Sequence, residues 1–290
     1  MTDATLRPRR SVLYMPGANE RALEKAKALD VDALILDLED SVSPDSKAEA
    51  RDRVCAAVQS GAYGHRELVI RTNGIDTKWH ADDLAAAAQA GPDGILVPKV
   101  NSAAEVQQIE AAMEKAGAPE STRIWAMVET PIAIRKVHEI AAASERLAVL
   151  VTGTNDLVAE LRAAHVRGRT PLLTALAQAL LGAREAGKVI LDGVYNDVRD
   201  AEGFEAECEQ GRDFGFDGKT IIHPSQIEPT NRIFAPSPEA IEHAHAVIDA
   251  FRAATAQGKG VLTVNGKMIE NLHVRDAERM LALAEAIQRD

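Results

Sequence analysis

The stretch DALILDLED, residues 32–40, contains the clearest strand signal in this chain. It begins with an unbroken apolar run and ends in three acids, Asp37, Glu39 and Asp40. A continuous apolar run is typical of a strand that is buried on both faces, as the strands of a parallel sheet are. Carboxylates gathered near one strand end must be solvated, paired with cations or placed around a metal ion. The stretch therefore predicts a buried strand that leads into a polar site.

Seven further apolar runs repeat this pattern along the chain. They lie at residues 11–17, 67–73, 93–99, 123–130, 147–156, 188–197 and 217–224. Alanine-rich, charge-patterned segments with helical spacing separate them. Strands that alternate with helices predict a parallel sheet covered by helices. So many repeats of the unit favour a closed (β/α)8 TIM barrel over an open sheet.

The barrel is expected to occupy residues 1–234 and to carry the metal and substrate site. The remaining residues, 235–290, are expected to form a C-terminal extension that acts as a lid or in oligomerisation. Ser237 suits an N-cap and Pro238 suits the first helical position. We expect a helix-hairpin-helix arrangement with helices over about 238–256 and 274–287 and a turn at Asn265-Gly266.

Composition and charge exclude several classes of protein. The chain has 290 residues, of which 46% are hydrophobic, and a formal net charge of −11. Such an acidic chain is a poor general binder of nucleic acid or anionic membranes. Cys55 and Cys208 lie far apart and match no metal spacing, so we interpret them as reduced thiols. With no recognisable secretory signal and no apolar run near the ~20 residues of a membrane helix, we expect a cytoplasmic protein.

Polar residues follow the predicted strands, where the chemistry of a TIM barrel is located. Each residue alone is commonly a helix cap or a loop ion pair, but together they predict an acidic barrel mouth with a few strong donors. They are Asp37, Glu39, Asp40, Arg71, Asn73, Lys99, Glu129, Thr130, Asp156, Asp192, Asp197, Lys219 and His223.

Glu129 and Asp156 are candidates for a metal site. They are expected to close the fifth and sixth strands, which are neighbours about 4.8 Å apart in a barrel. Two bare carboxylates so placed would repel each other, and a hard divalent cation removes that repulsion. Oxygen ligands favour Mg²⁺, with Mn²⁺ as an alternative, over Zn²⁺.

Arg71 is the fixed cation of this expected mouth. Its planar fork of donors suits a carboxylate or a developing oxyanion. The alternative is an ion pair with Asp37 or Glu39. The two interpretations are compatible, because such a pair can aim the arginine.

Tyr14, Arg21 and Lys25 form a weaker signal near the first expected helix. Arg21 and Lys25 are four residues apart, on one helix face near a helix N-terminus. Helix N-termini with nearby cations bind phosphates. The alternative is an ordinary solvated, charged face.

Several of these motifs together resemble a known family. The chain resembles the CitE-like branch of the HpcH/HpaI aldolase, citrate lyase beta subunit and malyl-CoA lyase superfamily over about residues 9–285. The motifs are RRSVLYMPGAN, LILDLEDSV, RTN, VPK, VET, TGTNDL, GFDGKTIIHPSQI and NGKMIEN, in that order. Their combination is specific, although any one of them alone is not.

The resemblance implies a Mg²⁺-dependent carbon–carbon lyase. Its substrate would be a 3-hydroxyacyl-CoA such as citramalyl-CoA or malyl-CoA, cleaved to acetyl-CoA and a 2-oxo acid. Carried onto this sequence, Glu129 and Asp156 bind the metal. Arg71 holds the hydroxy or oxo oxygen, and Asp40 supports the metal's waters.

The resemblance also implies how the thioester and the subunits are arranged. Tyr14, Arg21 and Lys25 would meet CoA, with Ile222 and His223 near the thioester arm. The family barrel is trimeric, so a homotrimer or a dimer of trimers is expected. The C-terminal segment of one subunit would lie over the mouth of a neighbour.

Glu270 is where the sequence departs from the family pattern. The family usually has Asp as the acid/base residue of this tail motif, and here the motif reads Met268-Ile269-Glu270. Glutamate keeps the carboxylate but moves it outward by about one C–C bond. Glu270 is therefore the expected proton donor or acceptor, with an altered reach.

Four other interpretations stay open at this point. A Schiff-base aldolase could use Lys99 or Lys219. A thioesterase could hydrolyse malyl-CoA in the same site. A citrate lyase beta subunit would take a citryl thioester, on an acyl-carrier protein or CoA, together with partner chains. A barrel without catalysis could serve as a binding module.

Overall fold

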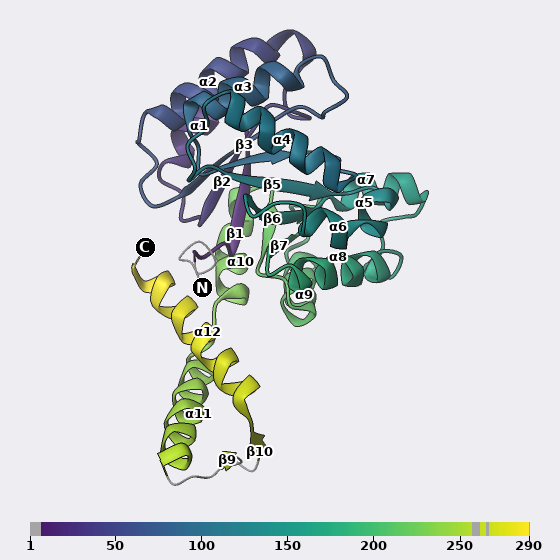
Figure 1. The fold of residues 1–290 in the computed structure, drawn as a ribbon. Helices are drawn as coiled ribbons and strands as arrows, with labels where there is room; N and C mark the ends of the chain where they lie inside the picture. Colours follow the sequence, from purple (N-terminus) through teal and green to yellow (C-terminus); the bar gives the residue numbers. More distant parts are fainter. Residues whose placement is uncertain (1–6, 257–261, 265–266, 290) are drawn as a thin grey trace. The chain divides into compact units, whose positions relative to one another are not determined.

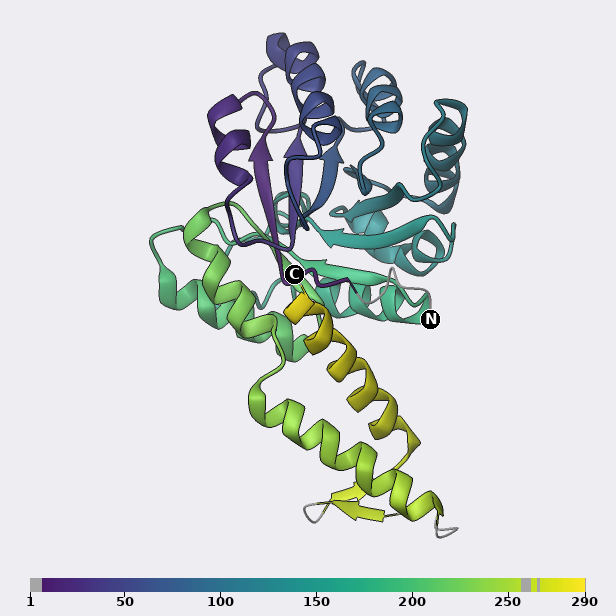
Figure 2. The ribbon, with the colours of Figure 1, turned by 90° about the vertical axis from the view of Figure 1, so that its left-hand side faces the viewer.

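The computed structural model describes residues 7–256, 262–264 and 267–289. The chain forms two compact units, which are considered separately (Figures 1 and 2). The larger unit is Arg9–Phe234, and residues 235–290 belong to the other.

The larger unit is a closed barrel of parallel strands in the order β1 to β8. The barrel closes where β1 pairs with β8 as well as with β2. The TIM-barrel prediction is therefore confirmed. The strands are β1 (Ser11–Pro16), β2 (Ala33–Asp37), β3 (Glu67–Arg71), β4 (Gly94–Val97), β5 (Arg123–Val128), β6 (Leu147–Thr152), β7 (Val189–Asp192) and β8 (Gly218–Ile221).

Helices connect the strands and surround the barrel (Figure 1). The segment after β5, which has the pattern of a single helix, is divided into two short helices at Lys136, whose backbone leaves the helical region. The helices are α1 (Glu20–Ala26), α2 (Lys47–Gln59), α3 (His80–Ala90), α4 (Ala103–Lys115), α5 (Pro131–Arg135), α6 (Val137–Ala141), α7 (Thr154–Leu161), α8 (Leu173–Glu185), α9 (Ala201–Phe214) and α10 (Ile227–Phe234). Two single turns of 3-10 helix, Pro44–Ser46 and Pro224–Gln226, precede α2 and α10.

Both faces of the strands are buried, which explains their continuous apolar runs. One set of strand side chains, including Ile35, Val69 and Trp125, fills the interior of the barrel. The alternate set, including Leu34 and Leu36, packs against the surrounding helices. This double burial fixes the strand register, so the residue that follows each strand is presented at one end of the barrel.

The second unit is a helical hairpin with a short two-stranded sheet (Figure 2). Ala244, Val247, Ile248, Ile269 and Ala277 form its small apolar cluster. The expected turn residues 265–266 lie outside the described residues. The elements are α11 (Pro238–Ala256), β9 (Leu262–Val264), β10 (Lys267–Ile269) and α12 (Asn271–Arg289), with β9 and β10 antiparallel.

The last helix begins three residues earlier than its sequence pattern indicates, at Asn271 instead of about residue 274. The backbone N–H of Glu270 donates to the His273 Nδ1 at 2.9 Å, which supports this earlier start. Within the described part of the chain, no helix is long and apolar enough to cross a membrane.

Candidate active site

A cavity of about 330 Å³ opens at the C-terminal ends of the strands. It brings six of the predicted site residues together, and Arg71 is the only Lys or Arg among the described residues that line it. The lining residues are Tyr14, Asp37, Asp40, Ser41, Arg71, Met127, Glu129, Thr152, Gly153, Thr154, Asn155, Asp156, Val194, Thr220 and Ile222.

Arg71 ends β3 and is held on several sides. Its Nε and Nη2 atoms donate to the two Asp37 oxygens at 2.6 and 2.8 Å. Its Nη1 atom lies 2.7 Å from the Glu39 carboxylate, and the guanidinium carbon lies 4.8 Å from the centroid of the Tyr14 ring. Burial alone would lower the pKa of Arg71, but Asp37 and Glu39 raise it above its ordinary value. Arg71 is therefore a fixed, permanently charged group. Its ion pairs with Asp37 and Glu39, which the sequence offered as an alternative, hold the guanidinium in its orientation.

Asp37 is the acid at the end of β2 that pairs with Arg71. Besides the arginine, its oxygens accept the backbone N–H groups of Glu39 at 2.9 Å and Ser41 at 3.1 Å. Burial raises the pKa of Asp37, but Arg71 and these donors outweigh it and leave the pKa below its ordinary value. Asp40 stays largely exposed, with its carboxylate 3.8 Å from the Arg71 Nη1.

Glu129 follows β5 and is almost fully buried, at 2% exposure. Its Oε1 accepts the backbone N–H of Lys99 at 2.8 Å. Burial raises the pKa of Glu129 to about 8, and repulsion from Asp156 and Glu39 adds to the effect. A buried carboxylate beside other acids is costly in its charged form unless a cation joins it.

Asp156 does not end a strand, contrary to the sequence prediction. The strand β6 stops at Thr152, and Asp156 lies in the first turn of α7. A carboxylate is favoured there by the positive end of the helix dipole. Asp156 nevertheless lines the same cavity as Glu129, and its Oδ1 lies 2.9 Å from the Lys99 Nζ.

These residues fit Mg²⁺ or Mn²⁺. Mg²⁺ keeps several waters and needs only one or two protein carboxylates. The described residues contain no group of three or more His, Cys, Asp or Glu that could hold a metal ion, so a cation here would depend on two carboxylates and on water. A divalent cation would relieve the repulsion between Glu129 and Asp156, in competition with the Lys99 ammonium.

The two lysines of the Schiff-base alternative are both engaged in ion pairs. Lys219 is fully buried and contacts Asp192 at 3.0 Å and Glu207 at 2.8 Å. Burial alone would lower the pKa of Lys219, but these acids raise it. The hydrogen bond to Asp156 likewise raises the pKa of Lys99. Schiff-base catalysis needs an amine with a lowered pKa, so the geometry does not favour it.

The remaining predicted residues lie outside the lining of the mouth. Arg21 and Lys25 are exposed on α1, and the side chain of Asn19 caps that helix. His223 is exposed, and its Nδ1 accepts the backbone N–H of Ser225 at 3.2 Å. Glu270 is exposed and belongs to the second unit. The roles of these four residues stay predictions.

Sequence reasoning missed several residues of the mouth. Four of them belong to the TGTNDL motif, from which we had predicted Asp156 alone as a site residue: Thr152, Gly153, Thr154 and Asn155. Other missed residues, such as Met127, Val194 and Thr220, sit in or next to strands and carry no polar pattern that distinguishes them.

The fold and the mouth together define a (β/α)8-barrel protein that gathers carboxylates around a buried arginine. The chain belongs to the HpcH/HpaI aldolase/citrate lyase family, whose sequence profile matches residues 10–224. The family resemblance of the sequence motifs is thereby confirmed.

Relatives with known names match nearly the whole chain. The (3S)-malyl-CoA thioesterase of Cereibacter sphaeroides (strain KD131 / KCTC 12085) is 49% identical over 280 residues, which are 97% of this chain and 96% of the relative. Citrate lyase subunit beta of Escherichia coli (strain K12) is 38% identical over 284 residues, covering 96% and 94%. The structure of CitE from Mycobacterium tuberculosis in complex with magnesium, acetoacetate and coenzyme A has a TM-score of 0.79 at 29% identity, covering 97% of this chain and 99% of that one.

Proposed function

We propose that this chain is a Mg²⁺-dependent enzyme that cleaves the carbon–carbon bond of a malyl-type or citramalyl-type 3-hydroxyacyl-CoA. The products are acetyl-CoA and a 2-oxo acid. One observation carries the proposal: Glu129 and Asp156 face a single cavity together with the fixed fork of Arg71. The names of the relatives, which include a malyl-CoA enzyme and a protein bound to magnesium and coenzyme A, support it.

Glu129 and Asp156 hold the cation in this proposal, and Asp40 orients its waters. When bound, Mg²⁺ supplies a Lewis acid for the carboxylate and adjacent oxygen of the substrate's 2-hydroxy acid unit. Arg71 donates to the same oxygen as its negative charge develops. Asp37 and the Tyr14 ring keep the guanidinium in place, so it needs little rearrangement during the reaction.

Glu270 provides the proton that the departing thioester carbon requires. Cleavage of the carbon–carbon bond turns the substrate hydroxyl into the carbonyl of the 2-oxo acid, with the hydroxyl proton passing to solvent. It leaves an enolate of the acetyl thioester, which becomes acetyl-CoA by accepting a proton at carbon. We assign this proton to Glu270 of a neighbouring subunit in a homotrimer or a dimer of trimers. CoA itself is assigned to Tyr14, Arg21, Lys25, Ile222 and His223.

Neutral variants of the metal carboxylates test the proposal. Glu129→Gln and Asp156→Asn should each lower turnover of malyl-CoA at least ~100-fold, because one of two cation ligands is lost. The matched control is Asp76→Asn, an exposed acid in the loop after β3, which should keep wild-type turnover. Near wild-type activity in Mg²⁺ for either mouth variant would show that the metal assignment is wrong.

Hydrolysis of malyl-CoA is the second candidate function. The thioesterases that are 49% identical to this chain favour it. Hydrolysis would release malate and free CoA, so the products distinguish the two candidates.

A further inference from the structure

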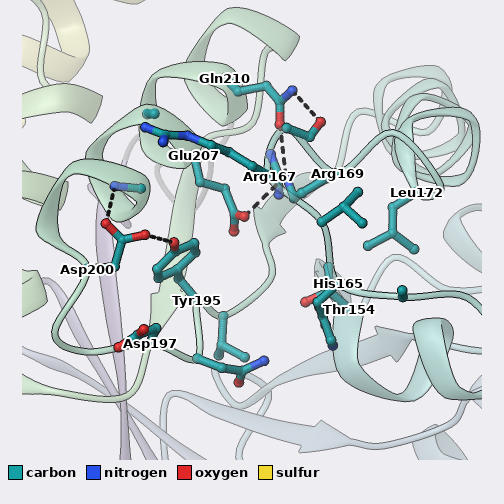
Figure 3. A pocket seen from close by; sticks show the side chains of 17 residues that line it. Thr154, His165, Arg167, Arg169, Leu172, Tyr195, Asp197, Asp200, Glu207 and Gln210 are labelled. Atoms are coloured by element: carbon teal, nitrogen blue, oxygen red, sulfur yellow. Dashed lines mark hydrogen bonds and ion pairs between the residues drawn. The ribbon is translucent and has the colours of Figure 1, made fainter.

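A second cavity of about 560 Å³ lies beside the mouth and has no part in the proposed reaction. Residues 164–172, the loop between β7 and α9, and α9 itself form its walls (Figure 3). Thr154 and Val194 line both cavities. Asn155 and Asn196 exchange side-chain amide hydrogen bonds at 3.1 and 2.7 Å, which tie together the walls of the two spaces.

Arg169 is the buried cation of this second cavity. It is 6% exposed, and its Nη1 donates to both Asp192 oxygens at 2.7 and 2.9 Å. Its Nε donates to Gln210 at 2.8 Å. Within the part of the chain that the structure describes, the Arg169 Nη2 has no hydrogen-bond partner. A buried guanidinium with one unsatisfied edge is a site for an acceptor group.

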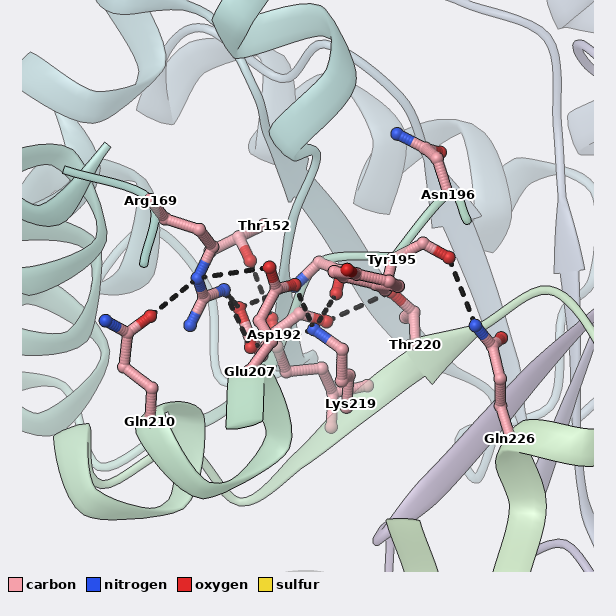
Figure 4. Close-up of polar contacts among 12 residues, drawn as sticks. Thr152, Arg169, Asp192, Tyr195, Asn196, Glu207, Gln210, Lys219, Thr220 and Gln226 are labelled. Carbon is pink, nitrogen blue, oxygen red and sulfur yellow. Dashed lines mark hydrogen bonds and ion pairs between the residues drawn. The ribbon is translucent and has the colours of Figure 1, made fainter. Parts of the chain in front are cut away.

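The network behind Arg169 keeps its guanidinium in place (Figure 4). Asp192 and Lys219 are both fully buried, and Lys219 also contacts Glu207 at 2.8 Å. The charge of Asp192 is thus shared between Arg169 and Lys219. Arg169 is therefore rigid, and Asp192 and Glu207 together balance the charges of Arg169 and Lys219. Among the described residues, the Nη2 edge of Arg169 is what remains for a ligand.

The acids of this cavity have partners within the fold, and Glu207, which contacts Lys219, lies 3.6 Å from the Arg169 Nε. Asp200 accepts from the Tyr195 hydroxyl at 2.6 Å and from the Gly203 N–H at 2.9 Å. Asp197 is exposed and accepts the backbone N–H of Arg199 at 3.0 Å. Figure 3 shows Asp197 and Asp200 on the Tyr195 side of the cavity, with Arg169 and Leu172 on the opposite side.

A second arginine, Arg167, adds an uncommitted cation to the lining. Among the described residues it forms no ion pair or hydrogen bond. The hydrogen bonds from Tyr195 and Gly203 lower the pKa of Asp200, and the nearby charge of Arg167 adds a smaller lowering. His165, exposed on the same loop, is a further donor. Leu172 and Val194 supply apolar contact area.

We propose that this second cavity binds a small oxyanion, a carboxylate or phosphate group, between Arg169 and Arg167. The apolar contacts leave room for a short organic acid beside the charged group. Three sources share this chemistry: a free 2-oxo acid, inorganic phosphate, and the phosphates of a nucleotide such as adenosine 3′,5′-bisphosphate. The binding does not depend on a metal or on the reaction proposed for the mouth.

Calorimetric titration of the full-length protein in EDTA tests this site without a cation in the mouth. The probes are pyruvate, glyoxylate, inorganic phosphate and adenosine 3′,5′-bisphosphate, each to millimolar concentration. At least one should bind saturably, and the probe that binds identifies the source. Arg167→Ser should weaken that binding about tenfold, as expected for a lost charge-assisted contact. Arg135→Ser, a change at an exposed arginine of α5 outside the cavity lining, should leave the affinity unchanged.

A second variant tests the buried arginine. Arg169→Lys keeps a charge next to Asp192 but loses the fork, so binding should weaken more than tenfold if circular dichroism shows a native fold. Arg167→Ser carries the test alone if the Arg169 variant does not fold. Absence of saturable binding to the wild-type protein, or unchanged affinity in Arg167→Ser or in a folded Arg169→Lys protein, would overturn the proposal. Each of these results is independent of whether the mouth catalyses a Mg²⁺-dependent reaction.

Discussion

Gly153 shows how closely single residues are specified in the mouth. A Cβ atom at this position would lie 2.0 Å from the Glu129 Oε2 and 2.5 Å from the Glu129 Cβ. The backbone of Gly153 has an ordinary φ of −91°, so the position requires space and not a glycine conformation. The glycine of the TGTNDL motif therefore makes room for the buried carboxylate of Glu129, which follows the neighbouring strand β5.

Gly153→Ala should push the Glu129 carboxylate out of its place in the cavity. We expect Mg²⁺-dependent turnover to fall at least ~100-fold, because a shift of about 1 Å in a catalytic group can cost that much. Gly74→Ala is the matched control, because its Cβ would lie 3.0 Å from an oxygen of Asp76, an exposed side chain that can move. Steady-state kinetics of both variants check this, and full activity of Gly153→Ala would contradict the position of Glu129.

Some residues of the mouth could be predicted from the sequence and others could not. Arg71 and Glu129 end or follow continuous apolar runs, and the barrel fold then places them at the mouth. Met127 lies inside such a run, where the pattern does not reveal which face a side chain occupies when both are buried. The contact between Lys99 and Asp156 depends on the left-handed backbone of Lys99, with φ of 51°, which has no signal in the sequence.

At the scale of elements, strands were more predictable than the starts of helices. All eight strands fall within the predicted runs, because burial on both faces demands apolar residues throughout. Asp156 was misplaced because α7 starts directly after Gly153, so the acid lies on a helix instead of a strand end. The early start of α12 has a similar cause, since a local contact of His273 extends the helix beyond its apolar pattern.

A buried ion pair, 3.0 Å long, joins Asp192 at the end of β7 to Lys219 near the start of β8. Burial raises the pKa of Asp192, but Lys219 and Arg169 outweigh it and hold the pKa below its ordinary value of 3.8. A carboxylate with a lowered pKa stabilises the fold above pH 3.8, and this contribution is lost as the pH falls through its folded pKa.

Asp192→Asn should therefore destabilise the protein at neutral pH by about 3–5 kcal/mol, since two buried cations lose the carboxylate that they share and keep only Glu207 nearby. The difference from wild type should narrow below pH 3.8, where the wild-type carboxylate also becomes protonated. Denaturant unfolding between neutral and acidic pH measures both effects. Asp213→Asn, which removes an exposed ion pair with Arg212, should change stability by less than about 1 kcal/mol. Equal stability of Asp192→Asn and wild type at neutral pH would contradict this account of the pair.

At the scale of the whole molecule, the proposed reaction needs a residue from each compact unit. Glu129, Asp156 and Arg71 belong to the barrel, and Glu270 belongs to the C-terminal unit. The sequence indicated the elements of that unit, but its role in an oligomer rests on the family resemblance. The assignment of Glu270 to a neighbour's mouth is thus a statement about assembly as well as chemistry.

Mixed oligomers test that assignment. Glu270→Gln and Glu129→Gln proteins should each be inactive alone. When they are unfolded and reassembled together, sites made from one intact barrel and one intact tail should restore part of the activity. Native mass spectrometry verifies that mixed oligomers form. Mixed oligomers without activity would mean that Glu270 serves its own barrel or has no part in the reaction.

Product analysis with malyl-CoA and citramalyl-CoA distinguishes Mg²⁺-dependent carbon–carbon cleavage from hydrolysis. The wild-type protein is incubated with each thioester in Mg²⁺ and, separately, in EDTA, and the products are separated by chromatography and identified by mass. We expect acetyl-CoA and the matching 2-oxo acid, glyoxylate or pyruvate, in equal amounts and only with the metal. Release of free CoA with malate would contradict carbon–carbon cleavage in favour of hydrolysis, and cleavage that persists in EDTA would contradict the metal site itself.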